Sequence, residues 1–128
     1  MDVSADEFYD ESRVAIAPMG FCFPGYDRNG GDLPPMKRCA KEWRQGLMDR
    51  LPDLKLILLV GGYSQKWHLG DRASARLTET VSSWRVFLSD GLFPTPHPSW
   101  RNNGWLKRND WFEADALPEL RARVRALM

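Results

Sequence analysis

The sequence predicts an α/β domain in which helices lie on both faces of a short, mostly parallel sheet, a three-layer α/β/α arrangement. Short apolar runs alternate with segments of helical periodicity, and the longest apolar run is almost unbroken, as in a strand covered on both faces. Parallel strands need long connections, so the order strand, helix, strand, helix, strand, helix favours a parallel sheet. With 128 residues, the chain is expected to form a single domain over residues 1–128.

Three apolar segments are the expected strands. Arg13–Phe21 is short and ends in the Gly- and Pro-rich stretch "CFPGYDRNGGDLPP". Leu54–Tyr63 reads "LKLILLVGGY" and is apolar almost throughout. The third segment, "LFPTP" from Leu92, leads directly to His97.

Three further segments have apolar residues three and four positions apart, which predicts amphipathic helices. They are Cys39–Leu51, Thr78–Leu88 and the C-terminal segment Leu117–Leu127. The side chains expected on their buried faces are Ala40, Trp43, Leu47, Leu51, Leu77, Val81, Trp84, Leu88, Leu117, Leu120, Val124 and Leu127. The last helix is expected to expose Arg121, Arg123 and Arg125 to solvent.

Composition excludes several classes of protein. No apolar run approaches the roughly 20 residues that a membrane span needs, so no membrane association is expected. The net charge of +1 argues against histone-like binding of nucleic acid through overall positive charge, although local basic patches can still bind phosphate. The acidic start "MDVSADEFYDES" lacks the basic and apolar parts of a signal peptide, which predicts a cytoplasmic location.

The loops that follow the expected strands should carry the functional residues, because α/β sheets place their sites beyond the carboxyl ends of the strands. Three loops qualify: Phe21–Pro35, Gly61–Lys66 and Thr95–Asn103. In the last of them His97 stands between two prolines, which restrict the backbone so that the imidazole can be aimed. A positioned donor of this kind is most useful where negative charge develops in a transition state.

The residues after His97 combine groups that suit nucleic acid. Ser99 and Arg101 could hold a phosphate, and Trp100 could enter a base stack. Trp105 and Trp111 are expected to pack beneath this loop instead. His68, the other histidine, is expected to be structural.

Five blocks of sequence stand in one order from about Phe8 onward: "APMGFCFPG", "GGDLPP", "CAKEW", "LILLVGGYSQKWHLG" and "HPSWRNNGWLKRNDWFE". Together they resemble the uracil-DNA glycosylase superfamily, specifically its small bacterial and archaeal members related to the iron–sulfur types. The resemblance implies base excision repair, with uracil-containing DNA as the partner and hydrolysis of the N-glycosidic bond of a flipped-out uracil as the reaction.

The same resemblance assigns roles to residues. His97 would donate a hydrogen bond to O2 of the uracil and stabilise the anion left as the bond breaks. Ser99, Trp100, Arg101 and Asn102 would contact DNA at the place that the base has left.

The resemblance also bears on the two cysteines as metal ligands. Cys22 and Cys39 match the last two cysteine ligands of the iron–sulfur members. Four thiolates normally hold such a cluster. The resemblance therefore implies that this chain holds no cofactor and that Cys22 and Cys39 are remnant ligands, with a 4Fe–4S cluster possible in full-length relatives. On spacing alone, the two cysteines are ordinary half-buried thiols.

This sequence departs from the family in one large respect. The first family block, a strand that runs into a Gly-x-Ala-Pro-Gly loop and supplies the residue that places the attacking water, does not occur. The resemblance therefore implies an N-terminally truncated domain whose first strand is missing. Arg13–Met19 and Leu54–Val60 would then border an empty position in the sheet, and self-association through these unpaired strand edges is expected.

Two readings follow, and a weaker third. The chain is a glycosylase of the uracil type, or it is a catalytically incomplete relative or fragment that binds DNA or a partner without base release. A flavodoxin-like module that binds a small nucleotide is disfavoured because the chain has no phosphate-binding loop.

Overall fold

The computed structural model describes residues 2–128, and these divide into two compact units. The sheet unit contains the residues up to Ala15 together with Lys55–Met128, and the insert unit contains Ile16–Leu54. Each unit is described by itself.

The sheet unit is built around two parallel strands, β1 (Ile57–Val60) and β2 (Leu92–Thr95). In the register of the pair, Leu58 lies opposite Phe93 and Val60 lies opposite Thr95. The chain between the strands forms the connection that a parallel pair requires. The predictions of an α/β class, of parallel strands and of strands within Leu54–Tyr63 and "LFPTP" are confirmed.

Four helical segments make this connection: α4 (Gly61–Leu69), a single 3₁₀ turn (Gly70–Arg72), α5 (Leu77–Ser82) and α6 (Trp84–Leu88). The helix expected over Thr78–Leu88 is therefore present, with a break at Ser83. Gly61–Lys66, expected as a loop, is the start of α4. The loop prediction is wrong because Gly61 turns the chain directly from strand into helix.

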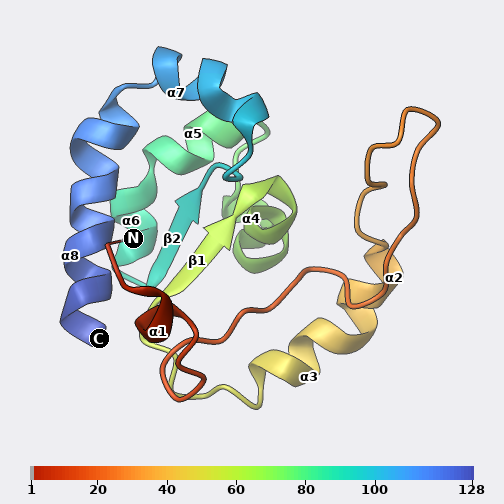
Figure 1. The fold of residues 1–128 in the computed structure, drawn as a ribbon, viewed down its shortest axis with the longest axis horizontal. Helices are drawn as coiled ribbons and strands as arrows, with labels where there is room; N and C mark the ends of the chain where they lie inside the picture. Colours follow the sequence, from red (N-terminus) through yellow and green to blue (C-terminus); the bar gives the residue numbers. More distant parts are fainter. Residues whose placement is uncertain (1) are drawn as a thin grey trace. The chain divides into compact units, whose positions relative to one another are not determined.

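Side chains from helices cover both faces of the strand pair. Successive residues of a strand point to opposite faces. Phe93 packs with Trp84 and with residues near the C-terminus, and the full cluster on this face is Val81, Trp84, Phe93, Phe112, Ala116 and Leu120. Leu59 packs in a second buried cluster with Leu69 and Phe87. Figure 1 shows the corresponding arrangement, with α8 on one side of the strands and α4 on the other.

The C-terminal part begins with a 3₁₀ turn (Trp100–Asn102) and α7 (Asn103–Arg108), and continues through a π-helical turn (Phe112–Ala116) into α8 (Leu117–Leu127). The predicted C-terminal helix is thus confirmed. Its outward face carries arginines as expected. Arg123 pairs with Glu119 at 2.7 Å, and Arg125 pairs at 2.7 Å with Glu7 of α1 (Ala5–Phe8).

The insert unit contains one continuous helical stretch: α2 (Lys37–Cys39), a π-helical segment (Ala40–Arg44) and α3 (Gln45–Met48). The predicted helix is confirmed, and Ala40 is buried as expected, but the rest of the expected buried face is only partly confirmed. Trp43, expected in the core, is 62% exposed, and Arg44 is buried instead. The π-helical segment contains more residues per turn than the three-to-four pattern assumes, so the following side chains are rotated.

A second prediction, a strand in the segment before the insert helix, is wrong. The expected strand over Arg13–Phe21 is absent, and its backbone is irregular. A strand needs a neighbour that accepts its hydrogen bonds, and the described residues pair no strand with this segment. The carbonyl oxygens of Ala17 and Pro18 are instead hydrogen bonded by Arg44 Nη1, each at 2.8 Å.

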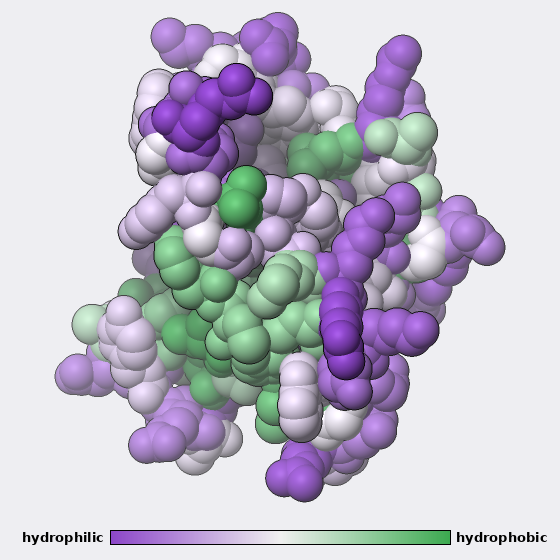
Figure 2. All heavy atoms as spheres, turned by 90° about the vertical axis from the view of Figure 1, so that its right-hand side faces the viewer, coloured by the Kyte–Doolittle hydropathy of each residue, from purple (hydrophilic) through white to green (hydrophobic). Residues whose placement is uncertain are grey.

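Hydrophobic residues also reach the surface. Figure 2 shows hydrophobic residues at the surface among hydrophilic ones. Both buried clusters described above consist of residues of the sheet unit, whereas the insert unit exposes many large apolar side chains. Those exposed in the insert unit are Ile16, Phe21, Phe23, Tyr26, Leu33, Met36, Trp43 and Leu54.

Within residues 2–128, none of the helices combines the length and the apolar character needed to cross a membrane.

Candidate functional site

The carboxyl ends of β1 and β2 lie side by side, and each leads into a functional segment. Thr95 ends β2 two residues before His97, and Val60, its partner in β1, is followed by Gly61. Gly61 has a φ of +79°, a conformation that side chains with a Cβ rarely adopt. A Cβ added to Gly61 would lie 3.6 Å from His97 Cβ and 3.8 Å from His97 Cδ2. His97 therefore sits directly against the turn at the end of β1.

A buried amide fastens the two strand ends together. Gln65, in α4, is only 2% exposed. Its Nε2 donates to the carbonyl oxygen of Thr95 at 2.8 Å and approaches that of Leu59 at 3.4 Å. The backbone that carries His97 is thus held from the β1 side by a side chain. Sequence analysis missed this role; the signal was a glutamine inside the apolar block "LILLVGGYSQKWHLG".

The loop after β2 is closed by its own hydrogen bonds. The His97 carbonyl oxygen accepts from the Ser99 amide at 2.8 Å and from Asn102 Nδ2 at 2.5 Å. The Asn102 amide donates back to the Ser99 carbonyl at 2.8 Å, and Ser99 Oγ accepts from the Arg101 amide at 3.4 Å. Asn102 therefore shapes this loop from within.

The outer side of the same loop presents an aromatic ring and cations. His97 and Arg101 are exposed, and Trp100 is 77% exposed, which is unusual for so large an apolar side chain. The Arg101 guanidinium lies 5.7 Å from the centroid of the Trp100 ring. Positive charge continues into α7 with Lys107 and Arg108. No acidic residue occurs between Asp90 and Asp110, so the local charge is strongly positive although the whole chain is nearly neutral.

Beneath this loop, Trp105 and Trp111 pack as predicted. Trp105 Nε1 donates to Thr78 Oγ1 at 2.8 Å, which joins α7 to α5. The two indole rings meet edge to face at 5.9 Å, and Trp105 also meets Phe112 at 5.6 Å. These contacts fix α7, and with it the exposed loop, to the core.

Comparison with known protein families agrees with this arrangement. The family model for the uracil DNA glycosylase superfamily matches residues 1–121. The chain belongs to the uracil DNA glycosylase superfamily. The match spans both strands, the His97 loop and both cysteines, so the resemblance seen in the sequence is confirmed at the level of the superfamily. Superfamily membership implies a uracil-DNA-glycosylase-like role with DNA as partner.

Cys22 and Cys39, which the sequence resemblance assigns as remnant cluster ligands, both lie in the insert unit. Cys39 is 6% exposed and Cys22 is exposed. Cys39 Sγ accepts a hydrogen bond from the Phe21 amide at 3.1 Å. Donation from the backbone amides of Phe21 and Cys22 lowers the pKa of the Cys39 thiol, because these bonds favour the thiolate.

This donor set does not fit a 4Fe–4S cluster. The chain has two cysteines, and residues 2–128 contain no group of three or more His, Cys, Asp or Glu side chains placed to hold a metal ion. Two thiolates are half of the set that such a cluster requires.

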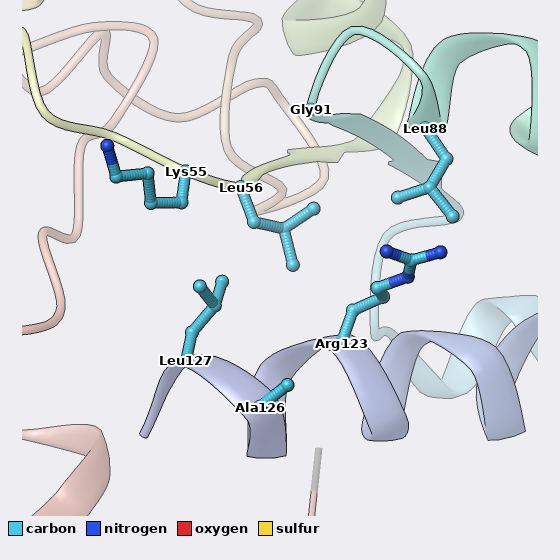
Figure 3. A pocket seen from close by; sticks show the side chains of 7 residues that line it. All are labelled: Lys55, Leu56, Leu88, Gly91, Arg123, Ala126 and Leu127. Carbon is cyan, nitrogen blue, oxygen red and sulfur yellow. The ribbon is translucent and has the colours of Figure 1, made fainter.

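Figure 3 shows the side chains around a hollow of about 170 Å³ in the sheet unit. Lys55 and Leu56 precede β1 and Gly91 precedes β2, so the hollow is at the amino ends of the strands, opposite the ends that lead to Gly61 and His97. The residues that line it are Lys55, Leu56, Leu88, Gly91, Arg123, Ala126 and Leu127.

Proposed function

We propose that this protein is a DNA glycosylase that releases uracil, with His97 as the group that stabilises the departing base. The observation that carries the proposal is the position of His97. It follows β2, lies against Gly61 at the end of β1, and is flanked by an exposed Trp100 and Arg101.

The reaction breaks the bond between C1′ of the sugar and N1 of uracil. The bonding electron pair leaves with the base and spreads toward O2, while the sugar gains positive character and is captured by water. An imidazole N–H that donates to O2 favours this charge where it forms, and a donor of this type contributes roughly 10²- to 10³-fold in rate. The proton lost by the water balances the negative charge on the released base.

Uracil inside a duplex is out of reach, so the base must first leave the stack. Trp100 is the side chain suited to occupy the vacated place, because its ring is exposed and its neighbour Arg101 can contact phosphate. Ser99 and Asn102 support the same segment through their hydrogen bonds to the loop backbone. We assign Ser99, Trp100, Arg101 and Asn102 to the DNA contact on this basis.

Single-turnover release of uracil from labelled single-stranded and duplex oligonucleotides tests the proposal. We expect release by the wild-type chain and a loss of about 10²- to 10³-fold in His97→Ala. His68→Ala removes the other histidine, whose ring meets that of Trp67 edge to face in α4, and serves as the matched control. Release that is equally fast in His97→Ala would contradict the assigned role.

A second candidate function is DNA binding without base release. It is favoured by one observation: the exposed Trp100 ring and the neighbouring Arg101 guanidinium suit contact with DNA whether or not a base is released. Folded protein that binds DNA in a salt-dependent way but releases no uracil would support this function.

A further inference from the structure

The register of the strand pair determines which backbone groups of β1 face away from β2. The Ile57 amide donates to the Gly91 carbonyl oxygen at 2.8 Å, so the backbone groups of Ile57 point toward β2. In a strand, the backbone groups of successive residues point alternately to one edge and to the other, so those of Leu59 also face β2. The backbone groups that face the outer edge are those of Leu56, Leu58 and Val60.

The outer edge of β1 is open. Within residues 2–128, no backbone hydrogen bond outside the strand pair involves the amide or the carbonyl group of Leu58, or the amide of Val60. The strand reads "ILLV" and contains neither a proline nor a charged residue. Soluble proteins usually protect an exposed edge with proline, charge or a bulge. Strand β1 therefore has the composition of an interior strand at the edge of its sheet.

The opposite edge of the sheet is protected. Because the Gly91 carbonyl faces β1, the same alternation places Leu92 and Pro94 on the outer edge of β2. Pro94 has no amide hydrogen to donate, and its side chain is less than 2% exposed. An added strand would find no donor at this position. The two edges of the sheet therefore differ in their capacity to accept another strand.

We propose that the outer edge of β1 pairs with the same edge of a second copy of this chain in a two-fold symmetric dimer. Identical edges related by a two-fold axis through the sheet run antiparallel. With the axis between the two copies of Leu58, each Leu58 amide donates to the Leu58 carbonyl of the other copy. Each Val60 amide then donates to the Leu56 carbonyl of the other copy. The proposal does not depend on the glycosylase reaction.

The side chains suit the same register. Leu58 and Val60 lie on one face of β1, because they are two positions apart. Leu58 is only partly buried against the core of the sheet unit, and Val60 is 40% exposed. Pairing would place the two copies of Leu58 side by side and cover Val60 with Leu56 of the other copy. Lys55 would lie opposite Gly61, so like charges would not face each other.

The proposed dimer has a defined size. Its sheet would have the order β2, β1, β1, β2 across the two copies, and each outermost edge would carry Pro94. Neither outermost edge would offer the donors that a third copy needs, so association should stop at two chains. A sheet of four strands is also more stable than an isolated pair.

Sedimentation velocity of the purified full chain over a series of concentrations tests the proposal. We expect a shift from the monomer mass to twice that mass, with no larger species. Val60→Lys introduces a charge at the edge and should raise the dissociation constant of the dimer at least about tenfold. Val86→Lys is the matched control, because Val86 is 63% exposed on α6, and it should leave the dissociation constant unchanged. Circular dichroism confirms that both variants are folded.

Amide hydrogen exchange, measured by nuclear magnetic resonance, locates the interface within the strand. The Leu59 amide faces β2 and should be protected at every concentration. The Leu58 amide should gain at least about tenfold protection as the dimer forms. This measurement uses the wild-type chain, so it remains decisive even if Val60→Lys does not fold.

Four results would overturn the proposal. The chain could stay monomeric at the concentrations needed for nuclear magnetic resonance, or it could form only larger aggregates. Association could be weakened equally by Val60→Lys and Val86→Lys. Exchange of the Leu58 amide could also be independent of concentration, which would place any dimer contact away from the outer edge of β1.

Discussion

Replacement of the buried Gln65 tests the architecture that holds His97. The Gln65 amide donates to Thr95 O at 2.8 Å and makes a longer, weaker hydrogen bond of 3.4 Å to Leu59 O. Gln65→Met keeps the size of the side chain and removes the donor. Loss of the bond, with a buried carbonyl left without its partner, should lower the free energy of unfolding by about 1–3 kcal/mol.

Gln65→Glu separates the hydrogen bond from the shape of the side chain. At neutral pH the new carboxylate would face the carbonyl oxygens of Thr95 and Leu59, so the loss should exceed that of Gln65→Met. Burial next to acceptors raises the pKa of a carboxyl above about 4.3, its unperturbed value. The protonated form can donate to Thr95 O, so part of the stability should return as the pH falls through the raised pKa and be lost again as the pH rises.

Urea unfolding, followed by tryptophan fluorescence at several pH values, measures these differences. Gln45→Met is the matched control, because Gln45 is exposed and donates to Asp49 at 2.8 Å on the surface. Its effect should stay within about 0.5 kcal/mol. If Gln65→Met costs no more than Gln45→Met, or if Gln65→Glu shows no dependence on pH, the role assigned to Gln65 is wrong.

Three further outcomes are expected. Trp100→Ala should weaken binding of single-stranded DNA by about 1–3 kcal/mol in fluorescence titrations but leave the melting temperature unchanged, because the ring is exposed; a lower melting temperature would instead indicate a packing role. For duplex DNA, a plot of the logarithm of the binding constant against the logarithm of the salt concentration should have a slope of about −2.7 if Arg101, Lys107 and Arg108 each contact one phosphate. Arg101→Gln should make this slope shallower by about 0.9. An unchanged slope would remove Arg101 from the interface. Since each strand of the two-stranded sheet has a partner on one side only, the purified chain should self-associate in size-exclusion chromatography with light scattering, and a monomer with a reversible cooperative melt would contradict this.

The parts of the fold that rest on local patterns could be predicted from the sequence. The strand within Leu54–Tyr63 and the helix at Leu117–Leu127 follow from apolar continuity and apolar spacing, which the neighbouring residues fix. The burial of Trp84 followed from the same spacing, and it is confirmed by its stacking on Phe93 at 5.3 Å.

The failures concern features that depend on distant partners. Arg13–Phe21 has the composition of a strand, but strand formation also requires a pairing neighbour. Trp43 is exposed and Arg44 is buried, the reverse of the expected pattern, because both lie in a π-helical segment that rotates the side chains. Arg44 also donates hydrogen bonds to the carbonyl oxygens of Ala17 and Pro18. Neither requirement is visible in the spacing of apolar residues.

One part of the candidate site could be predicted from the sequence, and another part could not. His97 was identified from its flanking prolines and the motif that follows it, and the structure places it against Gly61. The link between Gln65 and Thr95 was not identified, because it joins residues 30 positions apart through a side chain and a backbone carbonyl. Periodicity carries no information about such a bond.

The chain leaves the sheet unit after Ala15 and returns to it at Lys55, so the insert unit is an excursion within one continuous polypeptide. Regions with few buried apolar contacts open at a lower free energy than the core does. Amide hydrogens of Arg44 and its neighbours should therefore exchange with solvent while those of β1 and β2 are still protected. Hydrogen exchange should therefore show a faster phase for the insert unit and a slower phase for the strands that lead to Gly61 and His97.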